Sequence, residues 1–401
     1  MIDASRRKRI LARGRSQAGW EGEPRLGGWY TNKEIQAAVK SIRDSMDWRV
    51  GFGFITKEIT GFEKAFARYC GSKYAVSVAT ASIGLDMAVR CLNLRPGDEV
   101  ICPAINFKAS HMAILGAGGK IVFCDVDPRT FNTDPADVEK RITRRTRAIL
   151  PVHMNGLSAP MDDLLRIAKR HSRPGREPIR VIGDAARASG GGYRGGKIGK
   201  KGWMTVFSFH TMKLMTTLGE GGMITTDSAG VAKRLDDIRQ WGGAHGWGSS
   251  YKLTRVQAAV GLVQLRRLDG MIARRVRLAR LRSKMLEGVP ELALPFEPHD
   301  CAHTFYLYTL LLEPRWAGKK RDMVMEMLRK KYGVGCMIGN PPVYWDNSLI
   351  RKATGRQRLP LSESLGMRLF CPSLHPLMTD SQNEYIASAI IEAVERVRKG
   401  S

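Results

Sequence analysis

Short apolar stretches alternate with helical stretches along the first two thirds of the chain, and this alternation constrains the fold more than any other feature. The stretches expected to form strands are 74–78, 100–102, 120–125, 148–152, 181–182 and 223–226. Segments expected to be helical lie between them, for example 109–115 and 161–171. Such an alternation is typical of an α/β fold with a mostly parallel sheet that helices cover on both faces. Sheets of this kind bind ligands at the carboxyl ends of their strands.

Capping boxes mark several helix starts in the sequence. In such a box, the side chains of a Ser or Thr and of a Glu or Gln three residues later accept backbone N–H groups of the first turn. The four candidate pairs are Thr31 with Glu34, Thr60 with Glu63, Thr254 with Gln257 and Thr379 with Gln382. We therefore expect helices to begin at these four places.

The pattern divides the chain into three parts. Residues 1–28 are expected to form a mobile basic arm, and residues 29–253 a large domain built on the parallel sheet. Residues 254–401 are expected to contain a long helix and a smaller C-terminal α+β domain with a strand at 305–312. The basic residues in the first half of the arm are Arg6, Arg7, Lys8, Arg9, Arg13 and Arg15. Charge runs on helices usually face water, so we expect solvated side chains for Arg266, Arg267, Arg274, Arg275, Arg277, Arg280 and Arg282 of the long helix.

The charge of the chain favours anionic partners. Its 401 residues carry a net charge of +27, which suits phosphorylated substrates, nucleic acid or anionic lipid, although general solubility is the simpler explanation. No zinc-finger spacing, RNP-type aromatic motif or leucine-zipper heptad is present in the sequence. A nucleic-acid partner is therefore not expected.

The cysteines and the apolar runs bear on the cellular compartment. The seven cysteines are scattered and odd in number, which indicates reduced thiols in a reducing compartment. No apolar run is long enough to span a bilayer, and no apolar signal core follows the basic N-terminus. We expect a cytoplasmic protein without a membrane segment. We also expect no metal site, because the pair His299 and His303 follows Pro298 and precedes an expected strand, where helical spacing has no meaning.

Lys213 is the strongest candidate for a chemical role. It ends the segment 207–213, and the glycine-rich turn Gly-Glu-Gly-Gly follows at 219–222. Upstream, Asp184 closes an apolar run at 181–184. A lysine that forms a Schiff base needs a confined site, and pyridoxal phosphate needs such a lysine together with an acid beside its ring nitrogen. Most lysines are solvated surface groups, so the interpretation depends on the surrounding pattern.

That pattern resembles the DegT/DnrJ/EryC1/StrS aminotransferases from about residue 29 to the end of the chain. Each matching segment is weak alone, and their common order makes the resemblance specific. The segments are 62–67, 97–103, 123–127, 151–156 with 161–162, 183–186, 208–213, 219–222, 257–261 and 373–376. The resemblance implies a fold type I aminotransferase, in which a large domain binds pyridoxal phosphate and a smaller domain follows.

The resemblance also implies roles for particular residues. Lys213 would form the Schiff base and move a proton between substrate and cofactor, and Asp184 would pair with the ring nitrogen. Phe107 would stack on the ring, although a plain core phenylalanine is an equal alternative. Ala81 and Ser82 match the phosphate-binding turn at a helix N-terminus, where N-capping by Ser82 is the alternative.

Further positions complete the site that the resemblance implies. Ser208 matches a serine that contacts the phosphate. His210 and Tyr344, the latter in the stretch 339–344, are candidates for substrate contact; packing is the alternative for His210.

Three positions depart from the family pattern. Ala81 replaces a glycine of the phosphate turn, and Arg187 replaces a glutamine or histidine near the ring oxygen of the cofactor. Ser250 replaces an asparagine that reaches the phosphate in the neighbouring subunit. An arginine adds positive charge beside the ring, and a serine reaches less far than an asparagine.

We therefore expect a pyridoxal-phosphate aminotransferase that moves an amino group from glutamate or glutamine to a keto-sugar, with a nucleotide-linked sugar as the leading acceptor. A cyclitol ketone is the alternative acceptor. A homodimer is implied by the resemblance. The rival within the fold is a sugar dehydratase, in which histidine replaces the lysine, so Lys213 argues against it. The rival from another class is a non-catalytic regulatory or nucleic-acid-binding member of the fold.

Overall fold

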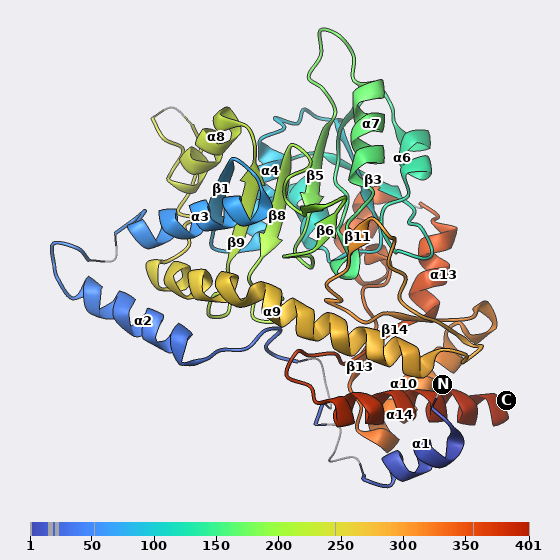
Figure 1. Ribbon diagram of the computed structural model, residues 1–401. Coiled ribbons are helices and arrows are strands. Elements are labelled where there is room, and N and C mark those ends of the chain that lie inside the picture. Colours follow the sequence, from blue (N-terminus) through green and yellow to red (C-terminus); the bar gives the residue numbers. More distant parts are fainter. Residues whose placement is uncertain are drawn as a thin grey trace.

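The computed structural model describes residues 2–14, 19–20, 24–51, 53–244, 246–355 and 357–400. Its largest element is a seven-stranded sheet in the order β1-β9-β8-β5-β4-β2-β3 (Figure 1). The strands are β1 (Tyr74–Val78), β2 (Glu99–Pro103), β3 (Lys120–Cys124), β4 (Thr146–Ile149), β5 (Arg180–Asp184), β8 (Met204–Ser208) and β9 (Gly222–Thr226). Only β9 runs antiparallel to its neighbours in this sheet. The mostly parallel α/β sheet expected from the sequence is confirmed.

Helices cover both faces of this sheet. They are α3 (Lys57–Cys70), α4 (Ala81–Arg90), α5 (Ala109–Gly116), α6 (Pro135–Arg141), α7 (Met161–His171), α8 (Ala229–Arg239) and α9 (Arg255–Leu286). Helix α2 (Asn32–Ser45) packs against α9. Successive side chains of a strand point to opposite faces. Ile182 and Val206 thus pack with α4, α5 and α8, whereas Phe207 packs with α3 and α9, and Val181 with α6 and α7.

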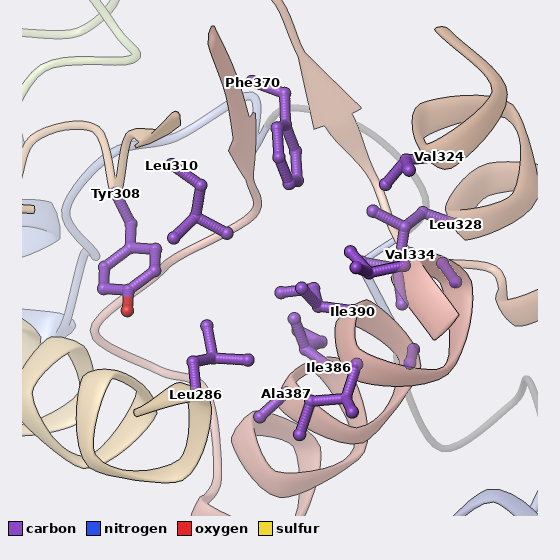
Figure 2. Packing of buried hydrophobic residues seen from close by; sticks show 14 of the residues in the cluster. Leu286, Tyr308, Leu310, Val324, Leu328, Val334, Phe370, Ile386, Ala387 and Ile390 are labelled. Atoms are coloured by element: carbon purple, nitrogen blue, oxygen red, sulfur yellow. The ribbon is translucent and has the colours of Figure 1, made fainter. Parts of the chain in front are cut away.

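A second, antiparallel sheet lies in the C-terminal part in the order β10-β12-β14-β13. Its strands are β10 (Leu292–Ala293), β12 (Leu310–Leu312), β13 (Cys336–Met337) and β14 (Leu369–Pro372), and the helices α10 (Lys319–Tyr332) and α14 (Asp380–Lys399) pack against it. Figure 2 shows Leu310 and Phe370 of this sheet facing Ile386 and Ile390 of α14. Shorter elements are β6 (Gly192–Tyr193), β7 (Gly196–Lys197), β11 (Cys301–Ala302), α11 (Val343–Asp346), α12 (Ser348–Thr354) and α13 (Pro360–Arg368).

The long helix α9 connects the two sheets (Figure 1). Its first half places Leu265 and Leu268 in the core with α3, and its second half places Leu286 in the core with α14. The expectation that all its arginines are solvated is wrong for Arg275 and Arg282, which are buried. Their guanidinium groups donate to oxygen atoms of distant segments, and the sequence of the helix cannot show those acceptors.

Three of the four predicted capping boxes are confirmed, at Thr31, Thr254 and Thr379. The fourth is wrong, because α3 already begins at Lys57 after the N-cap residue Thr56. Thr60 therefore lies inside the helix, where its hydroxyl donates to the carbonyl oxygens of Thr56 and Lys57.

The N-terminal segment differs from the expected mobile arm. Helix α1 (Ala4–Leu11) begins at the N-cap residue Asp3 and lies against α14. Ile10 is buried there, and Arg7 donates to Glu395 at 2.6 Å. Arg15 lies outside the described residues.

The strand expected at 305–312 is also wrong in its first half. Only Leu310–Leu312 pairs with neighbouring strands. Phe305 has a φ of +50°, a left-handed conformation that ends regular strand geometry. In the part of the chain that the structure describes, no helix is both long enough and apolar enough to cross a membrane.

The buried histidines predict how stability depends on pH. Burial lowers the pKa of His111 and of His153 to about 4, and that of His303 to about 3. An unfolded histidine has a pKa of about 6.5, so between about pH 6.5 and pH 4 the unfolded chain binds more protons than the folded chain. The stability that these residues contribute is complete above about pH 6.5 and is lost as the pH falls through this window.

Urea unfolding at pH values from about 7.5 to 4.5 measures this effect. We expect the free energy of unfolding to decrease towards the acid end, by about 1.4 kcal/mol for each pKa unit between the folded and unfolded chain. The variant His111→Gln should show a shallower pH dependence than the parent. If the free energy of unfolding depended on pH equally in both proteins, the assigned contribution of His111 would be contradicted.

Candidate active site

A cavity of about 520 Å³ lies at the carboxyl ends of the strands of the large sheet. Asp184 is the last residue of β5 and Ser208 the last residue of β8. Asn106 and Phe107 follow β2, and Thr80 follows β1. Because parallel strands end at the same edge of the sheet, these residues meet there, where ligands bind in such folds.

Asp184 is buried and held by three donors. The Ser110 hydroxyl donates to its Oδ2 at 2.6 Å and the Asn106 amide at 3.3 Å, while the backbone N–H of Ala186 donates to Oδ1 at 3.0 Å. The carboxylate therefore has a fixed orientation inside the cavity.

Lys213 also lines the cavity, and Tyr306 holds its amine. Its Nζ donates to the Tyr306 hydroxyl at 3.2 Å and lies 4.7 Å from the centre of that ring. The loop that carries Lys213 is fixed by Gly27, whose N–H donates to the Thr211 carbonyl at 2.9 Å. A Cβ on Gly27 would lie 2.2 Å from the Lys213 carbonyl oxygen, so only glycine fits there.

The predicted phosphate turn forms the N-terminus of α4. Thr80 is the N-cap residue, and its hydroxyl accepts the Ile83 N–H at 3.1 Å. N-capping by Ser82, the alternative considered from sequence, is therefore wrong. Ala81 and Ser82 line the cavity just inside the helix, where free N–H groups and the helix dipole favour an anion. Ser208 lines the same cavity, and its hydroxyl oxygen accepts the His210 N–H at 3.3 Å.

Phe107 is not a core residue, because 55% of its surface is exposed. It lines the cavity, as do Arg187 and His210. His210 Nε2 lies 3.9 Å from a carboxylate oxygen of Glu220. The arrangement thus leaves an aromatic face and an arginine open to a ligand.

Two predicted residues lie outside the cavity lining. The Tyr344 hydroxyl donates to Glu363 at 2.8 Å, and its ring packs against Phe123. Ser250 is exposed, and its hydroxyl oxygen accepts a hydrogen bond from Lys252 at 2.9 Å. Within the stretch 339–344, Asn340 is the residue that lines the cavity.

Three residues of the site were not predicted from the sequence. Tyr306 lies in a segment that was expected to be a strand, so nothing indicated that it faces Lys213. Asn106 and Ser110 both donate hydrogen bonds to Oδ2 of Asp184. Their signal was available: Asn106 is a polar residue directly after an apolar strand, and Ser110 follows one helical turn later.

The sequence model of the DegT/DnrJ/EryC1/StrS aminotransferase family matches residues 30–391. The chain belongs to this family. It is 40% identical to the GDP-perosamine synthase of Caulobacter vibrioides over 285 residues, which cover 67% of this chain and 73% of that protein. It is 32% identical to the dTDP-3-amino-3,4,6-trideoxy-alpha-D-glucose transaminase of Streptomyces venezuelae, over 91% of this chain and 93% of that protein.

A solved structure shows the same fold at similar identity. The chain superposes on Streptomyces venezuelae DesV, solved in complex with a ketimine intermediate, with a TM-score of 0.83 and 31% identity. The match covers 91% of this chain and 95% of DesV. Together these relatives show that the protein is a pyridoxal-phosphate-dependent aminotransferase of the sugar aminotransferase family with the type I fold.

The residues present fit this cofactor. The cavity offers an amine at Lys213, a buried carboxylate at Asp184 and an anion-binding helix N-terminus at Ala81. Gly222 packs closely against the predicted phosphate turn, because a Cβ on Gly222 would lie 2.7 Å from the Ala81 nitrogen. Among the described residues, no group of three or more His, Cys, Asp or Glu side chains could hold a metal ion.

The hydrogen bonds to Asp184 predict the effect of removing Ser110. Hydrogen bonds to charged groups contribute roughly 1.5–3 kcal/mol, so we expect Ser110→Ala to weaken binding of pyridoxal phosphate about 10- to 100-fold. A fluorescence titration of the apoenzyme with the cofactor measures this.

Ser388→Ala is the matched control. Ser388 is buried in α14, and its hydroxyl has no hydrogen-bond partner within the described part of the chain. Its removal should leave cofactor affinity unchanged. The same loss in both variants would indicate general destabilisation instead of a role for Ser110.

Proposed function

We propose that the protein transfers an amino group from glutamate or glutamine to the keto group of a nucleotide-linked sugar. The observation that carries this proposal is the placement of Lys213 and Asp184 in one cavity of about 520 Å³. This volume suits a cofactor together with part of a sugar substrate. When bound, pyridoxal phosphate would supply an electron sink for the chemistry at the amine-bearing carbon.

The residues of the chain have separate tasks in this proposal. Asp184 would hold a proton at the ring nitrogen, and Ser110 and Asn106 orient its carboxylate. Lys213 would hold the cofactor and then carry a proton between the reacting carbons. The distance of 3.2 Å to Tyr306 gives the lysine amine a defined resting position after it is released.

The N-terminus of α4, at Ala81 and Ser82, would hold the phosphate together with Ser208. Phe107 would cover the ring, and Arg187 would lie beside it. His210 would contact the acceptor from the Glu220 side of the cavity. These assignments keep the roles that the family resemblance implies.

The nature of the acceptor is supported by two of the relatives. Their names refer to a GDP-linked and a dTDP-linked sugar. The net charge of +27 favours an anionic acceptor of this kind. A cyclitol ketone carries no phosphate and would gain nothing from this charge.

A homodimer is the second part of the proposal. Apolar side chains are exposed on α2 and on the two loops beside it: Ile35, Val39, Ile42, Met46, Trp48, Val50, Phe54 and Trp241. Trp48 is 88% exposed. Lys252, which donates to Ser250, lies 3.7 Å from the centre of the Trp241 ring. The residue expected to face the phosphate of a neighbouring subunit therefore lies on the same apolar surface, which a second copy would cover.

The lysine provides the direct test of the reaction. The purified protein should be yellow with cofactor, and borohydride should fix the cofactor on Lys213, which peptide mass spectrometry detects. Lys213→Ala should lose this adduct and lower kcat by about three orders of magnitude or more, because both covalent attachment and proton transfer, worth about 10²–10⁴-fold, are lost.

The acceptor class is tested with the wild-type protein. A panel of nucleotide-linked keto-sugars and cyclitol ketones is offered with glutamate or glutamine, and aminated products are measured by mass spectrometry. Turnover of the cyclitols alone would contradict the acceptor proposed here. An uncoloured protein that gains no colour from added cofactor would contradict the whole assignment.

The apolar surface predicts the effect of placing charges on it. We expect the double variant Ile42→Glu with Trp48→Glu to shift the protein from dimer to monomer, because buried charges without partners oppose association. Sedimentation equilibrium measures the mass. Leu349→Glu is the control, since Leu349 is equally apolar and exposed but lies on α12; dissociation of this control, or an intact dimer in the double variant, would contradict the assigned surface.

A further inference from the structure

Arg187 is a buried cation in the wall of the active-site cavity. Its side chain lines the cavity with Lys213 and Asp184, and only 7% of the residue is exposed. The single hydrogen bond of its guanidinium group goes to the sulfur of Met154, at 3.8 Å from Nη1. A thioether is a weak acceptor, so the charge of Arg187 has little compensation from the protein.

The other buried arginines in the described part of the chain have stronger partners. Each donates to at least one oxygen atom of a carboxylate, an amide or a backbone carbonyl; they are Arg7, Arg239, Arg255, Arg275, Arg282 and Arg321. Arg187 is therefore exceptional among them. Arg187 is also the only one of these seven buried arginines that lines the active-site cavity.

A buried guanidinium without an oxygen acceptor is energetically costly. The cost is removed when a ligand brings an anion into the cavity. Arginine offers a planar pair of N–H donors that matches a carboxylate in a bidentate arrangement. The environment of Arg187 thus points to a carboxylate on a ligand that enters from the solvent.

The position of Arg187 relative to Lys213 indicates which carboxylate this is. Both cations lie over the ring of Tyr306, at 5.9 Å for the Arg187 carbon Cζ and 4.7 Å for the Lys213 Nζ. An α-amino acid carries its amine and its carboxylate on one carbon. A donor whose amine takes the place of the lysine amine would have its carboxylate close to the same ring and within reach of a guanidinium there.

We propose that Arg187 binds the α-carboxylate of the amino donor and so selects an α-amino acid over a simple amine. This inference rests on the proposed function, because the amine must exchange at Lys213. Tyr306 contacts both cations through its ring and accepts a hydrogen bond from Lys213. Arg187 thereby acts in the donor half of the reaction, because the acceptor sugar carries no α-carboxylate.

The experiment uses the cofactor-loaded enzyme and two donors that differ only at the α-carboxylate. L-Glutamate is compared with L-isoglutamine, in which this carboxylate is an amide. The loss of the yellow colour in a single turnover gives the apparent affinity for each donor. In the wild-type protein we expect isoglutamine to bind about 10- to 100-fold more weakly, as expected for loss of a charge-assisted pair.

The same two donors are then compared in the variant Arg187→Gln. It should weaken binding of glutamate about 10- to 100-fold and leave that of isoglutamine nearly unchanged, so that the two donors become equivalent. Arg187→Lys should restore part of the preference, because it keeps the charge but loses the bidentate geometry. Arg280→Gln is the matched control: Arg280 is exposed and paired with Glu297 at the surface, and its variant should keep the full preference.

Equilibrium binding gives a readout that does not depend on turnover. Isothermal titration of the loaded enzyme with glutarate, an unreactive dicarboxylate, should show binding to the wild-type protein and a loss of at least tenfold in Arg187→Gln. Thermal unfolding of both proteins shows whether the variant is folded.

The outcomes separate the two proposals. A wild-type protein that neither glutamate nor glutamine bleaches would contradict the proposed function itself. A protein that glutamate bleaches, but whose donor preference survives in Arg187→Gln, would overturn the role of Arg187 alone. Arg187→Gln could instead shift the pH at which the cofactor changes colour and keep the wild-type donor preference. That result would also overturn the role of Arg187 in donor binding, and would indicate that Arg187 contacts the ring oxygen of the cofactor.

Discussion

The guanidinium group of Arg275 is the interaction on which the active-site wall depends. It projects from α9 and donates to the carbonyl oxygens of Gly27 at 2.7 Å and Leu374 at 2.8 Å, with a third, longer bond to Phe305 at 3.5 Å. Burial lowers the pKa of Arg275 to about 10, so the group stays charged at neutral pH. Three segments that are distant in sequence are thus tied to one helix, and the removal of a single buried charge would free all of them.

Two of these segments adjoin residues that line the cavity. Gly27 packs against the carbonyl groups of the loop that carries Lys213, with no space for a side chain. Phe305 precedes Tyr306, whose hydroxyl receives the lysine amine. The position of the reactive amine therefore depends on the long helix α9, which connects the two sheets. A site assembled in this way is rigid before any ligand binds, which is what a precise proton transfer requires.

Local patterns predicted most of the fold, and the errors have a common physical cause. Six of the seven strands of the large sheet and three of the four capping boxes follow from short stretches of sequence, whereas β8 was not predicted. The family resemblance placed Lys213 and Asp184. The strand at 305–312 fails at Phe305, where a left-handed residue is held by the contact of its carbonyl with Arg275 and by stacking on His303 at 4.1 Å. The docking of α1 depends on contacts with the last helix of the chain. The last helix is hundreds of residues from α1, and Arg275 lies 30 residues before Phe305. No local pattern records either contact.

Arg275 and Arg187 show why the role of a buried arginine cannot be assigned from the sequence. Both are buried beside the same segment, one reaching the Phe305 carbonyl and the other lying over the Tyr306 ring. Backbone oxygens surround the first, so its charge is satisfied inside the protein and contributes rigidity. The second faces a sulfur atom and an open cavity, so its charge remains available to a ligand. The difference lies in which acceptors the fold brings to each guanidinium, and it separates a structural cation from one that recognises a substrate.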